Sequence, residues 1–263
     1  MSTRMPPAVV TVRAVRRIAS VAALGLAALP SISSIGIAQV AAGRDFLLGV
    51  PDGTLTLRGG WALASANSDI FSFTTGLLTV RHRDFSSPTA SADVAFRVLS
   101  KTDLVVSTGY SGMSKRSEFR GFIDNNNQPI EQNTQFIRVP LTVSVKQYLM
   151  SRGRSVGHLA WIPSRFAAYV GVGVGATWYR FRQDGDFIDF ADSSVFSAVM
   201  QSDGWTPEAH VLAGVEWNLS ARFAAVTEAR YERSYATLGA DFRNFAPIDL
   251  SGFSTTAGIA IRF

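Results

Sequence analysis

Hydrophobic and polar residues alternate along most of the chain, most regularly in its last fourteen residues, 250–263. The apolar row of this segment consists of Phe253, Thr255, Ala257, Ile259, Ile261 and Phe263. The row between them is small, hydroxylated or charged. Because successive side chains of a strand point to opposite faces, this period of two predicts a strand whose faces meet different surroundings. For this segment alone, a core strand of a soluble β-sandwich is the alternative.

Seven further segments alternate in the same way. The eight predicted strands are 54–66, 90–98, 103–112, 135–148, 165–181, 206–218, 222–235 and 250–263. Pro140 lies inside the fourth and has no N–H to donate, so we expect a bulge or a missing partner there. In the connection after the first strand, Asn67-Ser68-Asp69 predicts the cap of a short helix that runs to Leu78. An extra strand over 71–80 is the alternative.

The connections differ in length in a regular way. Those after the first, third, fifth and seventh strands are long (67–89, 113–134, 182–205 and 236–249). Two of the other three, 99–102 and 219–221, are short. Long outer loops and short periplasmic turns are typical of transmembrane barrels, so the pattern predicts an all-β, eight-stranded, antiparallel up-and-down transmembrane barrel. The connection 149–164 does not fit, because it is too long for a minimal turn.

The sidedness of the strands decides between lipid and water. A soluble eight-stranded barrel, such as a lipocalin, would point its apolar rows inward and its charged rows outward. Here the apolar rows carry almost no charge, as contact with lipid requires. The opposite rows mix charge with glycine, serine and threonine, which suits a crowded lumen. Both features favour a barrel with hydrocarbon outside.

The N-terminal segment, 1–38, predicts a cleavable secretory signal peptide. Four arginines precede a twelve-residue apolar run, 18–29, which is too short to span a bilayer as a helix. Residues 39–53 are then a periplasmic lead-in, and 54–263 form the barrel. Four of the 25 basic residues lie in the leader, so the remainder carries 21 against 20 acidic residues. This balance gives no reason to expect a nucleic-acid partner.

The inward rows predict a network of charges in the lumen. Its members are Arg58, Asp93, Arg97, Arg138, Lys146, Glu208, Glu216, Glu228, Arg230, Glu232 and Arg262. Eight strands leave an interior just wide enough for side chains to fill, and buried charges need partners. We therefore expect a largely filled lumen with paired charges. A narrow, gated path lined by the same groups is the alternative.

Catalytic and metal sites are not expected. His210 faces inward, but no serine lies two residues away on its face, where a deacylase-type barrel would place one. If the turn 219–221 sets the register, His210 lies near Arg230, and Glu208 lies near Glu232. The absence of cysteine excludes disulfides and thiolate metal sites. Asp184, Asp186, Asp189 and Asp192 form an acidic loop that we interpret as solvated rather than cation-binding.

Basic residues at the outer strand ends suggest contacts with the phosphates of lipopolysaccharide, because guanidinium groups bind phosphate well. Ordinary solubility of the loops is the alternative. The candidates are Arg180, Arg182 and Arg233. Other expected partners are outer-membrane lipid and, during biogenesis, periplasmic chaperones and the barrel-assembly machinery. We expect a monomer without a cofactor.

With its leader, eight alternating strands and terminal Ile261-Arg262-Phe263, the chain resembles the small outer-membrane barrels of the OmpA transmembrane-domain or OmpW type. The resemblance covers about residues 45–263 and implies bacterial outer-membrane localisation, with Phe263 as an insertion signal. The resemblance says little about activity, because a fold does not fix a function. With a largely filled lumen, we expect a structural or surface-interaction role. The alternatives are a narrow channel or transporter for small or hydrophobic solutes and, third, a lipid-modifying enzyme.

Overall fold

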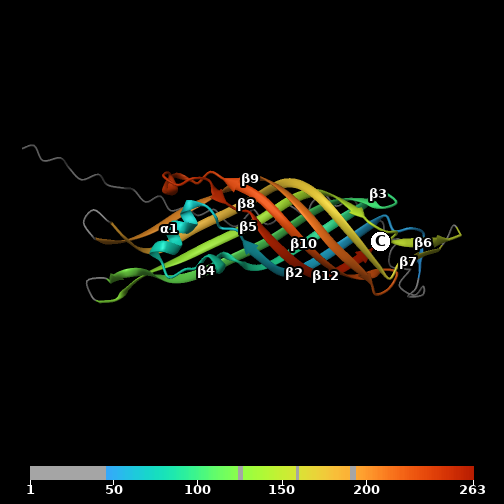
Figure 1. Ribbon diagram of the computed structural model, residues 1–263, viewed down its shortest axis with the longest axis horizontal. Helices are drawn as coiled ribbons and strands as arrows, with labels where there is room; N and C mark the ends of the chain where they lie inside the picture. Colours follow the sequence, from blue (N-terminus) through green and yellow to red (C-terminus); the bar gives the residue numbers. More distant parts are fainter. Residues whose placement is uncertain (1–45, 124–126, 158–159, 190–193) are drawn as a thin grey trace, which may run out of the picture. The chain divides into compact units, whose positions relative to one another are not determined.

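A computed structural model describes residues 46–263 except 124–126, 158–159 and 190–193. The predicted signal peptide therefore lies outside the described residues. Eight long strands form one closed antiparallel ring in this part of the chain (Figure 1). They are β2 (Gly53–Ala64), β3 (Ser87–Leu99), β4 (Thr102–Ile123), β5 (Pro129–Tyr148), β8 (Phe166–Ile188), β9 (Val195–Asn218), β10 (Phe223–Ala236) and β12 (Gly252–Arg262). The predicted eight-stranded up-and-down barrel is confirmed.

The ring closes where the end of the chain meets its beginning. Strand β12 pairs with β10 on one side and with β2 on the other. The backbone of Phe263 continues the second ladder, because its N–H donates to Gly53 O at 3.0 Å and its carbonyl accepts from Gly53 N at 3.0 Å. A last strand held on both sides has no free edge.

Two hairpins extend much further outward than the sequence predicts. Strands β4 and β5 stay paired almost to their connection, and β8 and β9 pair from Phe166 to Ile188. The predicted loops 113–134 and 182–205 are thus mostly strand, and this part of the prediction is wrong. Outside the apolar belt the outward face of a strand meets water, while the inward face contributes Phe119, Ile130 and Ile188 to an apolar cluster. The outward apolar row on which the prediction relied therefore ends there.

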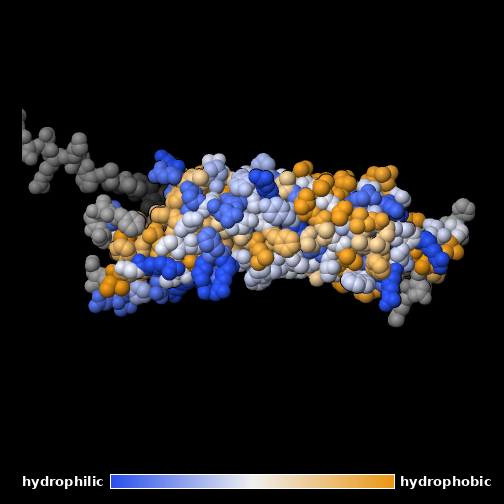
Figure 2. All heavy atoms as spheres, in the orientation of Figure 1, coloured by the Kyte–Doolittle hydropathy of each residue, from blue (hydrophilic) through white to orange (hydrophobic). Residues whose placement is uncertain are grey.

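The outer surface of the barrel carries a belt of aliphatic side chains. Figure 2 shows it as orange spheres on the half of the barrel that holds the C-terminus. Leu141, Val143 and Val145 are 46–54% exposed there, whereas the inward-facing Arg58 and Lys146 are buried. A soluble barrel of the lipocalin kind would reverse these faces. The interpretation with hydrocarbon outside is therefore confirmed, and the soluble alternative is wrong.

The outer connections fold over the mouth of the barrel. Helix α1 (Asp69–Leu77) lies in the first of them and buries Ile70, Phe71 and Thr74. The predicted helix is confirmed, and the alternative strand over 71–80 is wrong. The predicted side-chain cap is not formed by the N-cap residue Ser68, whose Oγ instead accepts a hydrogen bond from Asp249 N at 3.2 Å. The 3₁₀ helices η3 (His82–Phe85) and η4 (Ala240–Phe242) and the short strand β11 (Ile248–Asp249) complete this layer. No helix in the described ranges is both long enough and apolar enough to cross a bilayer.

The connection that did not fit a short turn forms a small sheet of its own. Strands β6 (Gly153–Val156) and β7 (Ala160–Pro163) make a hairpin, and β1 (Leu47–Leu48) from the lead-in adds to β7. This sheet lies at the end of the barrel where the C-terminus is found (Figure 1). It therefore ties the lead-in to the inner end.

Candidate functional site

The inner end of the lumen holds two carboxylates, each with its own arginine. Arg262 contacts Glu216 at 2.8 Å, and the hydroxyl of Tyr148 donates to the same carboxylate at 2.6 Å. Arg152 donates two hydrogen bonds to Asp103, at 2.7 and 2.9 Å. We call these residues the inner cluster. A bidentate arginine–carboxylate pair satisfies both oxygens, so these buried charges are compensated where they lie.

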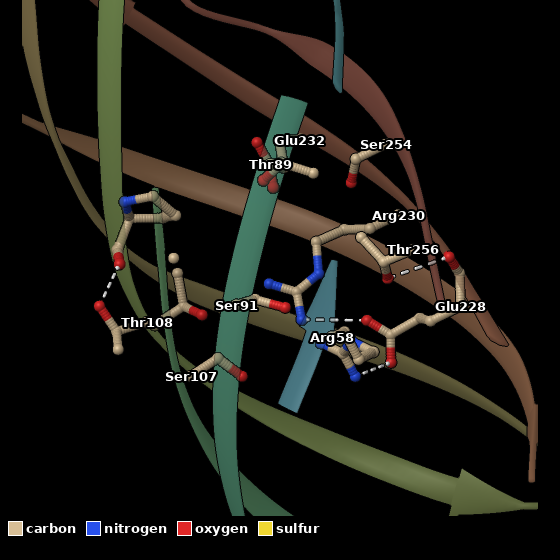
Figure 3. A pocket seen from close by; sticks show the side chains of 13 residues that line it. Arg58, Thr89, Ser91, Ser107, Thr108, Glu228, Arg230, Glu232, Ser254 and Thr256 are labelled. Atoms are coloured by element: carbon tan, nitrogen blue, oxygen red, sulfur yellow. Dashed lines mark hydrogen bonds and ion pairs between the residues drawn. The ribbon is translucent and has the colours of Figure 1, made fainter. Parts of the chain in front are cut away.

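Glu228 is the centre of a second group, the central cluster. Its carboxylate contacts Arg58 at 3.0 Å, Arg230 at 3.2 Å and Lys146 at 3.9 Å, and it accepts a hydrogen bond from Tyr169 at 2.9 Å. Arg58 also contacts Asp93 at 2.6 Å. Figure 3 shows the side chains of Arg58 and Arg230 converging on Glu228 from two sides. One carboxylate thus holds three cations in place.

A third group, the outer triad, joins Ser144, His210 and Glu208. The hydroxyl of Ser144 lies 2.8 Å from Nε2 of His210, and Nδ1 of His210 lies 3.3 Å from Glu208. Thr177 also donates to Glu208. Ser144 and His210 come from β5 and β9, and Gly173 of β8 lies between them. Because glycine has no side chain, the two groups can meet across the intervening strand.

The sequence did not reveal this triad, and its predicted register was wrong. His210 pairs with Glu232, and Arg230 pairs with Leu212, which is a shift of two residues from the expectation. Leu219 and Ser220 both donate backbone hydrogen bonds to Phe223 O, so the turn includes Arg222 and is longer than 219–221. The signal available in the sequence was the glycine row of β8, which leaves space beside His210.

Three predicted members of the charge network lack an ionic partner. Within the described ranges, Arg97, Arg138 and Glu232 form no ion pair within 4.0 Å. Arg138 instead donates to the carbonyl of Leu250 at 2.8 Å, and Arg97 donates to that of Ser100 at 3.4 Å. Glu232 borders two small cavities. Asp103, Arg152, Tyr148 and Tyr169 were not predicted. Asp103 is the first residue of a predicted strand, Arg152 lies in the connection 149–164, and the other two are tyrosines.

Little space remains among these side chains. The cavity in Figure 3, between the central cluster and Pro140, measures about 30 Å³, and a neighbouring one beside Glu208 measures about 20 Å³. Such volumes hold one or two water molecules. The described lumen is therefore largely filled by side chains.

The barrel wall is locally interrupted at Pro140. The β4–β5 ladder lacks the pairs that would join Gly109 to Pro140 and Tyr110 to Val139, and it resumes in the same register on either side. The hydroxyl of Thr108 donates to Pro140 O at 3.1 Å across the gap. The expected absence of a backbone partner for Pro140 is confirmed on the side of β4.

The outer mouth is filled by aromatic rings instead of charges. Phe71 of α1 lies 4.7, 5.5 and 5.8 Å, between ring centroids, from Phe85, Phe136 and Phe181. All four rings are buried, and we call them the aromatic plug. Above them, α1, η4 and the two extended hairpins enclose a largely apolar pocket of about 250 Å³.

The three arginines predicted to contact lipopolysaccharide lie on the outward face of β8 and β10. Arg180 stacks over Trp178 at 5.0 Å from the ring centroid, and Arg233 lies 5.7 Å from that of Tyr235. Arg182 contacts Asp184 at 2.9 Å, so part of its charge is already neutralised. The three arginines therefore differ in how much of their positive charge is free to bind an external phosphate.

The predicted acidic loop, which holds the aspartates between positions 184 and 192, is only partly described. Asp184 and Asp186 belong to β8, Asp189 follows it, and Asp192 lies outside the described residues. In the described part of the chain, no group of three or more histidine, aspartate or glutamate residues is placed to hold a metal ion.

No family model matches the chain, and no curated protein matches its sequence. Among solved structures it is similar to the outer membrane protein OprG of Pseudomonas aeruginosa, with 13% identity and a TM-score of 0.45, over 82% of this chain and 99% of that one. Neisserial surface protein A has 11% identity and a TM-score of 0.44, over 80% and 96%. The attachment invasion locus protein Ail of Yersinia pestis has 13% identity and a TM-score of 0.40, over 81% and 99%.

The closed ring of eight strands, its aliphatic belt and its polar, filled lumen define the class of this protein. It is a small β-barrel of the bacterial outer-membrane type.

Proposed function

We propose that this protein acts through its surfaces, as a structural or interaction barrel, and does not conduct solutes through its lumen. The supporting observation is the continuous filling of the barrel, from the inner cluster through the central cluster to the aromatic plug. The cavities of about 30 and 20 Å³ between the clusters are too small for a hydrated ion path.

Planar-bilayer recordings of the purified, refolded protein test this proposal. We expect no large, steady single-channel conductance, whereas a general porin inserted into the same bilayers conducts. Large, steady openings by the wild-type barrel would contradict a filled lumen.

We propose that lipopolysaccharide is one interaction partner, bound by Arg180, Arg182 and Arg233. Their position beside outward-facing aromatic rings at the outer end supports this, since guanidinium groups bind phosphate. Replacing Arg180 and Arg182 together by glutamine should weaken lipopolysaccharide association severalfold. Arg180→Gln alone should contribute more than Arg182→Gln, because Arg182 already contacts Asp184.

Arg116→Gln is the matched control for lipopolysaccharide binding. Arg116 also lies on the outer part of a strand, but it already contacts Glu131. An unchanged affinity in the Arg180/Arg182 double variant would refute the proposed contact.

We propose that the outer triad stabilises the barrel and does not catalyse a reaction. Neither Ser144 nor His210 borders the pocket or either lumen cavity described above. A nucleophilic serine needs room for a substrate carbonyl beside it. Lipid A mass spectra and ester-hydrolysis rates should be the same for the wild type and Ser144→Ala, and a loss in the variant would establish catalysis.

Passage of small solutes is the second candidate, favoured by the interrupted wall at Pro140 and the cavity beside it. On this hypothesis, liposomes containing the wild type take up a small solute. Pro140→Val, which restores a backbone donor, should then slow the uptake. Equal uptake by wild-type, variant and empty liposomes would exclude this candidate.

A further inference from the structure

The pocket above the aromatic plug is the largest of the three cavities described here, at about 250 Å³. Its lining comes from α1, η4 and all four strands of the two extended hairpins, including Phe119 of β4 and Gln132 of β5. Phe73 and Leu77 come from α1, Phe242 from η4, Phe196 and Met200 from β9, and Phe187 from β8. Its volume exceeds the roughly 150 Å³ of an apolar cavity that binds benzene, so a bicyclic molecule is of suitable size.

The walls of this pocket remain partly exposed. Phe73 and Phe196 are 47% and 43% exposed, although each has an aromatic neighbour, Phe245 at 5.2 Å and Phe187 at 5.9 Å between ring centroids. Apolar walls with a few convergent polar groups are the usual composition of a small-molecule site. A ligand would cover aromatic surface that water now reaches, which supplies a hydrophobic driving force.

Two buried amides, the hydroxyl of Thr74 and the exposed carboxylate of Asp241 supply the polar part of the pocket, and Asp241 already accepts a hydrogen bond from Gln201 N at 2.9 Å. Gln132 donates its Nε2 to Asp186 O at 2.8 Å, and Gln183 donates its Nε2 to Thr74 Oγ1 at 3.2 Å. Both side chains are at least 95% buried, and both border the pocket. Because these bonds use the NH₂ groups and fix the amides, each carbonyl oxygen remains able to accept a hydrogen bond. The pocket therefore offers acceptors to a ligand that carries a donor.

The pocket ends at the aromatic plug. Ile70, Phe71 and Phe181 are fully buried beneath it, and Phe181 packs against Phe242 at 5.6 Å. These buried side chains separate a molecule bound in the pocket from the charged lumen. The site is suited to capture from the outer side and not to passage through the barrel.

We propose that this pocket binds a small amphipathic molecule, with an aromatic or compact aliphatic body of about ten heavy atoms and one hydroxyl or N–H donor. The body lies between Phe73, Phe196 and Met200, and the donor points to Gln132 or Gln183. This binding is independent of the proposed lipopolysaccharide contacts, which involve the outward faces of β8 and β10.

Two matched probes test both parts of the proposal. 1-Naphthol and 1-methoxynaphthalene share a body, but only the first carries a donor. Their binding to the full-length mature barrel in nanodiscs is measured by equilibrium dialysis, with empty nanodiscs subtracted. We expect saturable 1:1 binding of 1-naphthol and at least about fivefold weaker binding of the methyl ether, as the loss of one hydrogen bond implies.

Two variants separate the apolar pocket from its acceptors. Met200→Trp should fill the pocket and weaken both probes at least tenfold, whereas Val199→Trp, on the opposite face of the same strand, should leave binding unchanged. Gln132→Met with Gln183→Met should abolish the preference for 1-naphthol. Heat-modifiable migration in gels verifies that each variant is folded.

Equal binding by Met200→Trp and Val199→Trp would overturn the site. Equal binding of the two probes to the wild type would overturn the role of the amides. If Gln132→Met with Gln183→Met does not fold, this probe comparison in the wild type still decides that role. Lipopolysaccharide association, measured on the same Met200→Trp sample, should be unchanged, so failure of this site is distinguishable from failure of the proposed surface role.

Discussion

The inner part of the lumen and its outer mouth are filled by opposite kinds of side chain. The inner and central clusters contain charges whose partners lie on other strands, as when Arg58 of β2 meets Glu228 of β10. The aromatic plug contains rings that contact one another edge to face. A charge in a barrel is stabilised only by a partner at the correct position, whereas a ring is stabilised by any close apolar neighbour. Neutralising a single charge in the first region should therefore lower the stability of the barrel strongly. In the second region, the loss of stability should depend on the side-chain volume removed.

The largest expected effect is at Glu228, which compensates three cations. Glu228→Gln leaves Arg58, Arg230 and Lys146 without their shared carboxylate. We expect a loss of about 3–5 kcal/mol in the free energy of unfolding, as for other broken buried ion pairs. Urea unfolding in lipid vesicles measures it.

Glu131→Gln is the control for this prediction. Glu131 also contacts an arginine, Arg116, but that arginine is 75% exposed. Exposed pairs contribute at most about 1 kcal/mol. Similar losses in the two variants would show that the lumen is more hydrated than its burial indicates.

The aromatic plug should respond through volume. Phe71→Ala removes a fully buried ring with three aromatic neighbours, and we expect a loss of about 3 kcal/mol. Phe73→Ala, on the same helix and 47% exposed, should cost about 1 kcal/mol or less. The same unfolding assay measures both. If the two substitutions had equal effects, α1 would not be packed into the mouth as described.

The smallest effect tests the space between Ser144 and His210. A Cβ on Gly173 would lie 2.5 Å from both Ser144 Oγ and His210 Nε2, so Gly173→Ala must separate them. We expect a loss of about 1–3 kcal/mol from overpacking and the broken hydrogen bond.

Gly204→Ala is the matched control for this last prediction, because the nearest atom to its new Cβ would be 3.8 Å away. It should leave the unfolding free energy unchanged within about 0.5 kcal/mol. Thermal unfolding followed by gel migration measures both glycine variants. An unchanged stability in Gly173→Ala would mean that the outer triad is not packed around this glycine.

The sequence by itself determined the number of strands, their sidedness and the charge-rich, crowded lumen, and it favoured helix α1 over an extra strand. These features can be read from a short stretch of sequence. The two faces of a strand alternate residue by residue, and a proline such as Pro140 lacks a backbone N–H in any surroundings. The lengths of β4, β5, β8 and β9 were underestimated because the outward apolar row ends where the strands leave the lipid.

Only the tertiary structure decided which groups meet. The pairing of His210 with Glu232 depends on the length of one turn, and the contact of Ser144 with His210 depends on Gly173 of the strand between them. The outer pocket joins α1, η4 and the two hairpins β4–β5 and β8–β9, which come from different parts of the chain. Such contacts follow from strand register and closure of the ring, and neither is recorded in the periodicity of any single segment.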